Sequence, residues 1–365
     1  MIDFSPTVEQ EEIRQLARSL ASDRLRPEGH SAERRGDISV ELMQMLTQTG
    51  LTTPFSEDLG GSGPLDAITY ALIAEELGFG DGGLAMNIFG SMLGPLAVAL
   101  AGNERQQEQL VYPFCDVQEG YKERGSLAFA ERTGGYTVAE INTTLRRDGD
   151  YYIMNGTKRD VIHGAHSHPR VVLARLADTT GSEGVCAVVM PAQIEGLQIT
   201  PDAQKLGLLA APSAAYTLND VVVAPDALLG EPGNAGVLRV ASLSALLRAA
   251  VTCGMVRASL EYSGHYAEER IAFGRPIVSY QGIAFLLAEM AMKLDAARLL
   301  LWHAAAQWDR VLAPETLLRD AEAAQYQAVK LAKSATIDAV QIMGGAGFMQ
   351  DHPVEMWMRN AAAME

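Results

Sequence analysis

Hydrophobic positions repeat with a helical period in the first third of this chain. An apolar stripe runs from Ile13 to Ala21, and Ser5 followed by Pro6 predicts the cap and the first residue of that helix. The same period returns in the last third of the chain. Helices are predicted at 40–49, 66–78, 83–101, 104–112, 236–269, 278–310 and 315–342.

Between the two helical parts the pattern changes to short, β-branched apolar runs separated by Pro, Gly and Asp turns. Asp148-Gly149 stands between two such runs and is a strong hairpin signal. The pattern therefore predicts a mostly α protein with a small central β-domain. Its parts are an N-terminal helical domain at 1–124, a middle β-domain of barrel or sandwich type at 125–235 and a C-terminal helical bundle at 236–365.

Composition and charge narrow the class of protein. The chain has 365 residues, 48% of them hydrophobic, and is long enough to bury a large core in two or three structural units. Its formal net charge of −16 argues against general nucleic-acid binding, which needs a basic face. The separated cysteines Cys115, Cys186 and Cys253, with no CxxC pair, predict free thiols.

A membrane span and a secretion signal are not expected. The most apolar window, 83–102, is interrupted by several glycines and by Asn87, Ser91 and Pro95, and this predicts a buried helix. The first residues show no basic region followed by an apolar core, as a signal peptide would. We therefore expect a cytoplasmic protein that does not bind membranes.

Two segments carry the clearest sign of chemistry. The first, 270–277, is a short turn between two predicted helices; it contains Arg270 and Phe273 and is followed by Gln281. An arginine at a helix junction is suited to clamp a pyrophosphate, and a neighbouring glycine lets the backbone approach such a group. The second segment, 341–348, follows another predicted helix and contains three glycines.

These two segments, in this order, resemble the acyl-CoA dehydrogenase family of flavoproteins. Three further stretches match that family, at 54–63, 152–158 and 219–225, so the resemblance covers essentially the whole chain. It implies the same three-part organisation that the periodicity predicts. It also implies FAD as the cofactor.

In such enzymes a glutamate removes the α-proton of an acyl thioester while the β-hydride passes to N5 of FAD. The resemblance therefore implies α,β-dehydrogenation of an acyl-CoA or of an acyl-carrier-protein thioester. It implies further that the chain forms a homo- or hetero-oligomer, a dimer or a tetramer, in which one subunit holds part of its neighbour's FAD.

The resemblance also assigns roles to single positions. It implies contacts to the adenosine and pyrophosphate of FAD from Arg270, Phe273, Gln281, Gln341, Gly344 and Gly345, and contacts to the flavin ring from Phe129, Ala130, Asp160 and Ile162. Glu131 and Arg248 are assigned to the substrate. A purely structural interpretation competes with the assignment to adenosine and pyrophosphate. In that interpretation Arg270 ends a helix and Gly344-Gly345 make an ordinary turn.

The ring and base positions depart from the family. Ala130 replaces a hydroxyl residue, Asp160 replaces an aromatic lid over the flavin, and Ile162 replaces a hydroxyl donor near N5. The usual position of the base lies beyond Glu365. The alternative position, on the first helix of the C-terminal bundle, is Ser244, which is not acidic. No catalytic residue is therefore assigned in this sequence.

A metal site is the remaining candidate chemistry. His163, His166 and His168 have a spacing at which imidazoles can converge in a loop. No acidic or cysteine ligand stands nearby at a zinc-like spacing, so no metal is expected. The three histidines are predicted to lie in a solvent-exposed loop.

Three functions remain open at this point. The first is an FAD-dependent acyl-thioester dehydrogenase. The second is a non-catalytic or half-site subunit that completes a flavin site with an active homologous partner. The third is a flavin-dependent monooxygenase of the same fold, a reaction that does not need an α-proton base.

Overall fold

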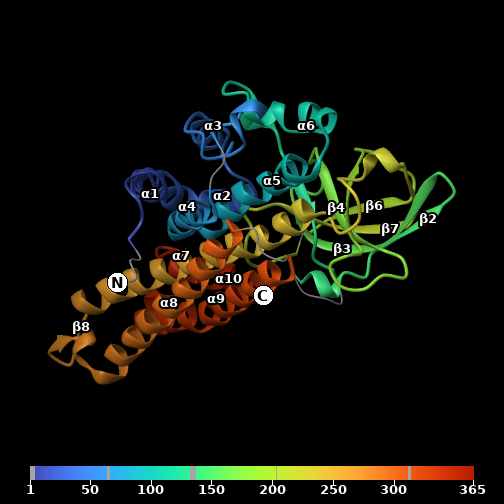
Figure 1. Cartoon of the computed structure of the whole chain (residues 1–365). Helices are drawn as coiled ribbons and strands as arrows, with labels where there is room; N and C mark the ends of the chain where they lie inside the picture. Colours follow the sequence, from blue (N-terminus) through green and yellow to red (C-terminus); the bar gives the residue numbers. More distant parts are fainter. Residues whose placement is uncertain (1–4, 64–65, 132–136, 203, 311–313) are drawn as a thin grey trace.

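The computed structural model describes residues 5–63, 66–131, 137–202, 204–310 and 314–365. Two helical regions are separated along the chain by a β-domain, which lies at one end of the molecule (Figure 1). The predicted class, mostly α with a small central β-domain, is confirmed.

The N-terminal region is helical. Its helices are α1 (Val8–Leu20), α2 (Arg26–Arg35), α3 (Val40–Gln48), α4 (Ala67–Gly80), α5 (Gly82–Ala101) and α6 (Glu104–Leu110). The predicted cap at Ser5 is wrong, because Thr7 and Gln10 exchange side-chain and backbone hydrogen bonds in a capping box two residues later. Helix α2 was not predicted, since Pro27 and Gly29 suggest a break in the helix.

Within its described residues, the β-domain contains one sheet of seven strands in the order β1-β4-β2-β3-β7-β6, with β5 paired to β4. The strands are β1 (Ser126–Ala128), β2 (Thr144–Asp148), β3 (Tyr151–Ile162), β4 (Arg170–Leu176), β5 (Val185–Met190), β6 (Leu197–Pro201) and β7 (Ser213–Val223). The predicted hairpin is present, because Asp148 pairs with Tyr151 around Gly149. Strand β3 is bulged against β7 between Lys158 and Val161, a point that matters for the site.

The C-terminal region is a bundle around α7. It contains α7 (Ala235–Glu269), the two-residue strands β8 (Ile271–Ala272) and β9 (Arg275–Pro276), α8 (Gln281–Trp308), α9 (Pro314–Met343) and α10 (Val354–Ala362). Helix α7 packs against α4, α5, α8 and α9 and is buried over most of its length. The long helices predicted from the apolar period are therefore confirmed.

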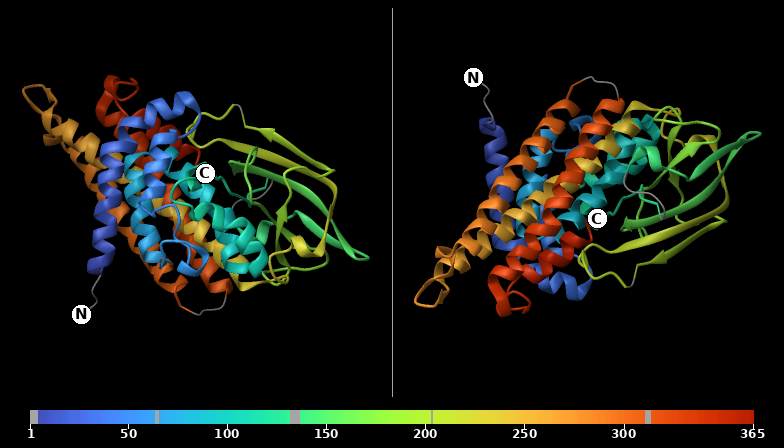
Figure 2. Two further views of the ribbon diagram at one scale, coloured as in Figure 1. Left: turned by 90° about the horizontal axis from the view of Figure 1, so that it is seen from above. Right: turned by 90° about the horizontal axis from the view of Figure 1, so that it is seen from below.

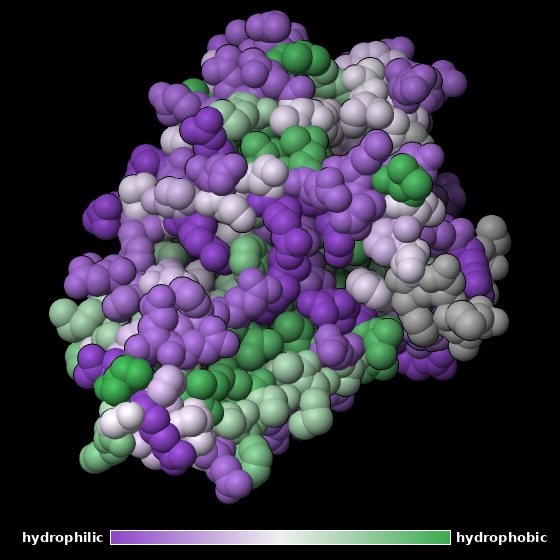
Figure 3. Space-filling view, turned by 90° about the vertical axis from the view of Figure 1, so that its left-hand side faces the viewer, coloured by the Kyte–Doolittle hydropathy of each residue, from purple (hydrophilic) through white to green (hydrophobic). Residues whose placement is uncertain are grey.

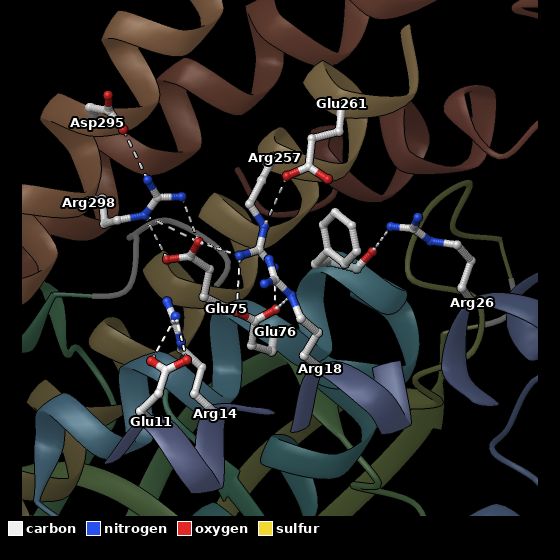
Figure 4. A network of polar contacts seen from close by, with 11 residues as sticks. Glu11, Arg14, Arg18, Arg26, Glu75, Glu76, Arg257, Glu261, Asp295 and Arg298 are labelled. Carbon is white, nitrogen blue, oxygen red and sulfur yellow. Dashed lines mark hydrogen bonds and ion pairs between the residues drawn. The ribbon is translucent and has the colours of Figure 1, made fainter. Parts of the chain in front are cut away.

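Two glycines let α4 and α7 cross closely. A Cβ on Gly254 would lie 2.2 Å from the carbonyl oxygen of Glu75, and a Cβ on Gly78 would lie 2.4 Å from that of Val251. This approach brings charged side chains together inside the bundle (Figure 4). Arg257 of α7 bonds to Glu76 at 3.1 Å. The neighbouring Glu75 bonds to Arg298 of α8 at 2.7 Å.

Helices α5 and α7 are long and apolar enough to cross a membrane. In their most apolar windows, however, 78% and 94% of the residues are buried inside the protein. Such burial is what a core helix requires. This agrees with the prediction of a buried helix at 83–102.

The β-domain and the β8–β9 hairpin lie at opposite ends of the molecule (Figures 1 and 2). The contacts explain this arrangement. Helix α9 starts near the β-domain, where Glu322 accepts from the amide of Val138, and α8 returns there, where Trp308 donates to the carbonyl of Arg239. The far end of the bundle therefore contains the C-terminus of α7 and the N-terminus of α8.

Candidate flavin and acyl-thioester site

A small pocket lies where α5 and α7 meet the β-domain, with a volume of about 40 Å³. Helix α5 contributes Met86, Gly90 and Leu93, and helix α7 contributes Ser244 and Arg248. Strands and loops of the β-domain complete the lining with Leu127, Phe129, Ala130, Arg159, Asp160 and Ile162. The pocket therefore brings together the four residues assigned to the flavin ring with Ser244 and Arg248 of α7, although these residues come from three separate parts of the chain.

Arg248 is buried at the α7 wall of this pocket. Its guanidinium donates to the carbonyl oxygen of Met364 at 2.8 Å. The C-terminal segment after α10 is thus fastened to α7, and its last residue, Glu365, pairs with Lys333 of α9. Neighbouring Ser244 is also buried.

Glu131 does not line the pocket, although the sequence assigned it to the substrate. It is buried in the β-domain, where its carboxylate accepts from Lys158 Nζ at 2.7 Å, from Thr143 and from the amide of Asn142. Burial opposes ionisation, but the Lys158 ammonium and these hydrogen bonds hold the pKa of Glu131 below its usual range. These contacts favour a structural role inside the β-domain.

Asp160 and Ile162 sit at the end of β3 with different exposures. Asp160 has a φ of 53°, and its half-exposed carboxylate lies 3.5 Å from Arg159. Ile162 is partly buried and packs against the main hydrophobic core of the protein. An aspartate at an exposed bulge is reasonable, because it tolerates the left-handed region better than bulkier side chains.

The predicted exposed loop at 163–168 is wrong for its first histidine. His163 is buried, and its Nε2 lies 3.0 Å from the carbonyl oxygen of Asn87 on α5. Burial, assisted by Arg124, lowers the pKa of His163 to about 4, so the imidazole is neutral at ordinary pH. His166 and His168 are exposed as predicted. Within the part of the chain that the structure describes, no cluster of metal-binding side chains is found.

The residues assigned to adenosine and pyrophosphate lie away from this pocket, at the opposite end of the bundle. Arg270, Gln281 and Gln341 are exposed there, and Phe273 is 97% exposed with a φ of 50° at the tip of the β8–β9 hairpin. Apolar side chains gather at this end (Figure 3). Helices α8 and α9 also expose apolar side chains along their length, among them Phe285, Met292, Tyr326 and Ile337.

This end of the bundle fits the pyrophosphate half of FAD. A Cβ built on Gly344 or on Gly345 would meet nothing within 4 Å, so the backbone is open to a ligand. The exposed guanidinium of Arg270 supplies the positive charge. The ring pocket and these residues lie at opposite ends of the chain.

Comparison with known proteins identifies the family of this chain. The domain models for the N-terminal, middle and C-terminal domains of acyl-CoA dehydrogenases match residues 7–118, 126–221 and 236–365. The chain belongs to the acyl-CoA dehydrogenase family. A probable acyl-CoA dehydrogenase of Bacillus subtilis is 30% identical, over 100% of this chain and 95% of the relative. The mitochondrial short-chain specific enzyme of Rattus norvegicus is also 30% identical, over 97% and 85%.

Solved structures show the same relationship. Butyryl-CoA dehydrogenase from Megasphaera elsdenii superposes with a TM-score of 0.84 at 27% identity, covering 100% of this chain and 95% of that structure. Not every relative is named for dehydrogenation. A 3-(aryl)acrylate reductase of Clostridium sporogenes is 30% identical to this chain, over 97% of the chain and 93% of the reductase.

Sequence reasoning missed the α5 side of the pocket. Met86, Gly90 and Leu93 were assigned to a buried helix without a role. A glycine inside an apolar helix was the available signal, since it marks a place where another group approaches closely. What approaches Gly90 was not visible in the sequence.

Proposed function

We propose that this chain is an FAD-dependent protein of the acyl-thioester dehydrogenase type, whose substrates are carried by CoA or by an acyl-carrier protein and whose catalytic base is assigned to none of its described residues. The cofactor is FAD, which supplies a hydride acceptor when bound. The observation that carries the proposal is the pocket, which unites the β-domain positions Phe129 and Asp160 with Ser244 and Arg248 of α7.

The chain's own residues position the reactants in this proposal. Arg270, Gly344 and Gly345 hold the pyrophosphate of FAD bound mainly by a neighbouring subunit. Arg248 anchors the segment after α10 at the substrate wall through Met364. The α-proton must be taken by a base, and we assign that step to none of the described residues, because α7 presents a serine at the family's alternative position.

A half-site subunit is the second candidate, and a specific observation favours it. The pocket has an aspartate and an isoleucine at the flavin-ring positions and no acidic side chain from the described residues of α7. The pyrophosphate half is exposed and open. Such asymmetry is what a hetero-oligomer permits, in which this chain completes an active partner's site.

Retention of FAD by the Arg270→Ala variant tests the shared site. Loss of a charge-assisted contact is worth about 1.5–3 kcal/mol, so FAD should bind roughly ten- to hundredfold more weakly. Arg275→Ala is the matched control, because that guanidinium lies in the same hairpin but stacks on the Tyr280 ring at 4.1 Å. Equal FAD retention by both variants would contradict the clamp, and a monomeric mass by light scattering would contradict the shared site.

A further inference from the structure

The β-domain wall of the ring pocket comes from two segments that are not neighbours in the sheet. Phe129 and Ala130 follow β1, whereas Asp160 and Ile162 belong to the last part of β3. Strands β4 and β2 stand between β1 and β3 in the order of the sheet. The hydrogen bonds between neighbouring strands therefore do not join the two segments directly.

Lys158 of β3 joins them instead. Its ammonium donates to the carbonyl oxygen of Phe129 at 3.1 Å and to the carboxylate of Glu131 at 2.7 Å, and we call these two bonds the Lys158 link. The amide of Arg159 donates to the carbonyl oxygen of Ala130 at 3.0 Å. Three consecutive residues after β1 are thus held by β3, beside the bulge that interrupts its pairing with β7.

The Lys158 link consists of buried charges. The side chains of Lys158 and Glu131 are 0% and 5% exposed, and Glu131 also accepts from the amides of Asn142 and Thr143. Burial lowers the pKa of Lys158 to about 8 although Glu131 opposes this, so the ammonium prevails at pH 7. A buried ion pair adds little net stability, because desolvation offsets the attraction. What the link does supply is a fixed geometry between the two segments.

We propose that Lys158 is a positioning residue for FAD, which ties the segment after β1 to the end of β3 and so holds the two halves of the flavin-ring wall at one spacing. The proposal rests on the proposed function, because it assumes that the flavin ring lies at these residues. It also gives Glu131 a role, since this carboxylate anchors Lys158. The residues assigned to adenosine and pyrophosphate lie at the other end of the chain, so the link should affect the ring half of FAD alone.

The test compares the binding of FAD with that of ADP. ADP shares the adenosine and pyrophosphate of FAD but lacks the flavin, so the ratio of the two dissociation constants reports the contribution of the ring half. Dilution of the FAD-loaded protein, followed by flavin fluorescence, gives the dissociation constant of FAD. Displacement of FAD by ADP gives that of ADP.

Lys158→Met/Glu131→Gln removes the link without leaving an unpaired buried charge, and the amide oxygen at position 131 can still accept from Asn142 and Thr143. We expect FAD to bind at least about tenfold more weakly to this double variant, because ring contacts are lost, while the affinity for ADP stays the same. Glu131→Gln alone should keep the parent's ratio, because Lys158 still donates to the carbonyl oxygen of Phe129.

Arg170→Met is the matched control. Arg170 is a second buried cation of the β-domain, 2% exposed, and donates to the carbonyl oxygen of Pro191 at 3.1 Å. It does not line the ring pocket. Its loss should lower the midpoint of thermal unfolding without changing the ratio of FAD to ADP affinity.

The outcomes separate this proposal from the proposed function. An unchanged ratio in the double variant refutes the positioning role and leaves the proposed function standing. Equal weakening of FAD and ADP, or an equal change of the ratio in Glu131→Gln or in Arg170→Met, also refutes the role of Lys158. If the parent binds FAD no more tightly than ADP, both proposals fail. If butyryl-CoA does not perturb the flavin absorption of the loaded parent, the proposed function fails, whereas the predicted loss in the double variant still supports the role of Lys158.

Discussion

Asp81 shows how one buried carboxyl links helix capping to pH. It lies between α4 and α5, is 1% exposed, and one carboxylate oxygen accepts from the amide of Leu84 at 2.8 Å. The other oxygen has no hydrogen-bond partner among the described residues. Burial, assisted by the charge of Glu33, raises the pKa of Asp81 to about 6. Burial thus outweighs the capping hydrogen bond from Leu84, which favours the ionised carboxylate, and the folded protein favours the protonated carboxyl.

Asp81→Asn should remove this dependence on pH. The folded pKa lies above the ordinary value, so the stabilisation is complete at low pH and is lost as the pH rises through about 6. Relative to the variant, the parent should gain roughly 2–3 kcal/mol of unfolding free energy between pH 7 and pH 4. Urea unfolding across this range measures the difference. Parallel curves for the two proteins would show that Asp81 does not titrate as the structure indicates.

At the scale of elements, the α4–α7 crossing organises the helical core. Gly78 and Gly254 allow the close approach, and the approach places Arg257 against the carboxylates of Glu75 and Glu76. A buried charge is tolerated when it is paired and hydrogen-bonded, but desolvation offsets most of the attraction. We therefore expect this ion network to fix how α4 and α7 pack against each other and to contribute little net stability.

Two alanine substitutions on α7 should have opposite effects. In Gly254→Ala the new methyl group meets α4 backbone atoms at 2.2–2.8 Å, and we expect a loss of at least about 2 kcal/mol in unfolding free energy. In Gly264→Ala the nearest atom is 3.9 Å away, so the better helix propensity of alanine should add up to about 1 kcal/mol. Chemical unfolding measures the unfolding free energy of both variants. A loss of similar size in both would show that the close crossing of α4 and α7 does not cause the loss in Gly254→Ala.

At the scale of the whole molecule, activity depends on a base for the α-proton, a role that we assign to none of the described residues. Removal of a general base from α-proton abstraction typically costs about two to four orders of magnitude in rate. We therefore expect the 365-residue chain, loaded with FAD, to show little dehydrogenation of propionyl- or butyryl-CoA with an artificial electron acceptor. Addition of an active homologous subunit is the informative comparison. Turnover at an ordinary enzymatic rate by this chain alone would direct attention to Asp160, the acidic residue in the pocket lining.

The sequence by itself determined the elements and the family of this protein. Apolar period and turn residues are local properties, so they predicted the long helices, the hairpin at Asp148-Gly149 and the β-domain between two helical regions. The segments around Arg270 and Gly344 are also local, and they indicated the cofactor before any contact was known.

Only the tertiary structure decided which side chains face the site. Glu131 pairs with Lys158 inside the β-domain, His163 is buried against α5, and Ile162 rather than Val161 meets Gly90. Each outcome depends on a strand bulge or on a partner far away in the sequence. A one-residue shift in a strand reverses the direction of every side chain after it, and local pattern does not specify such a shift.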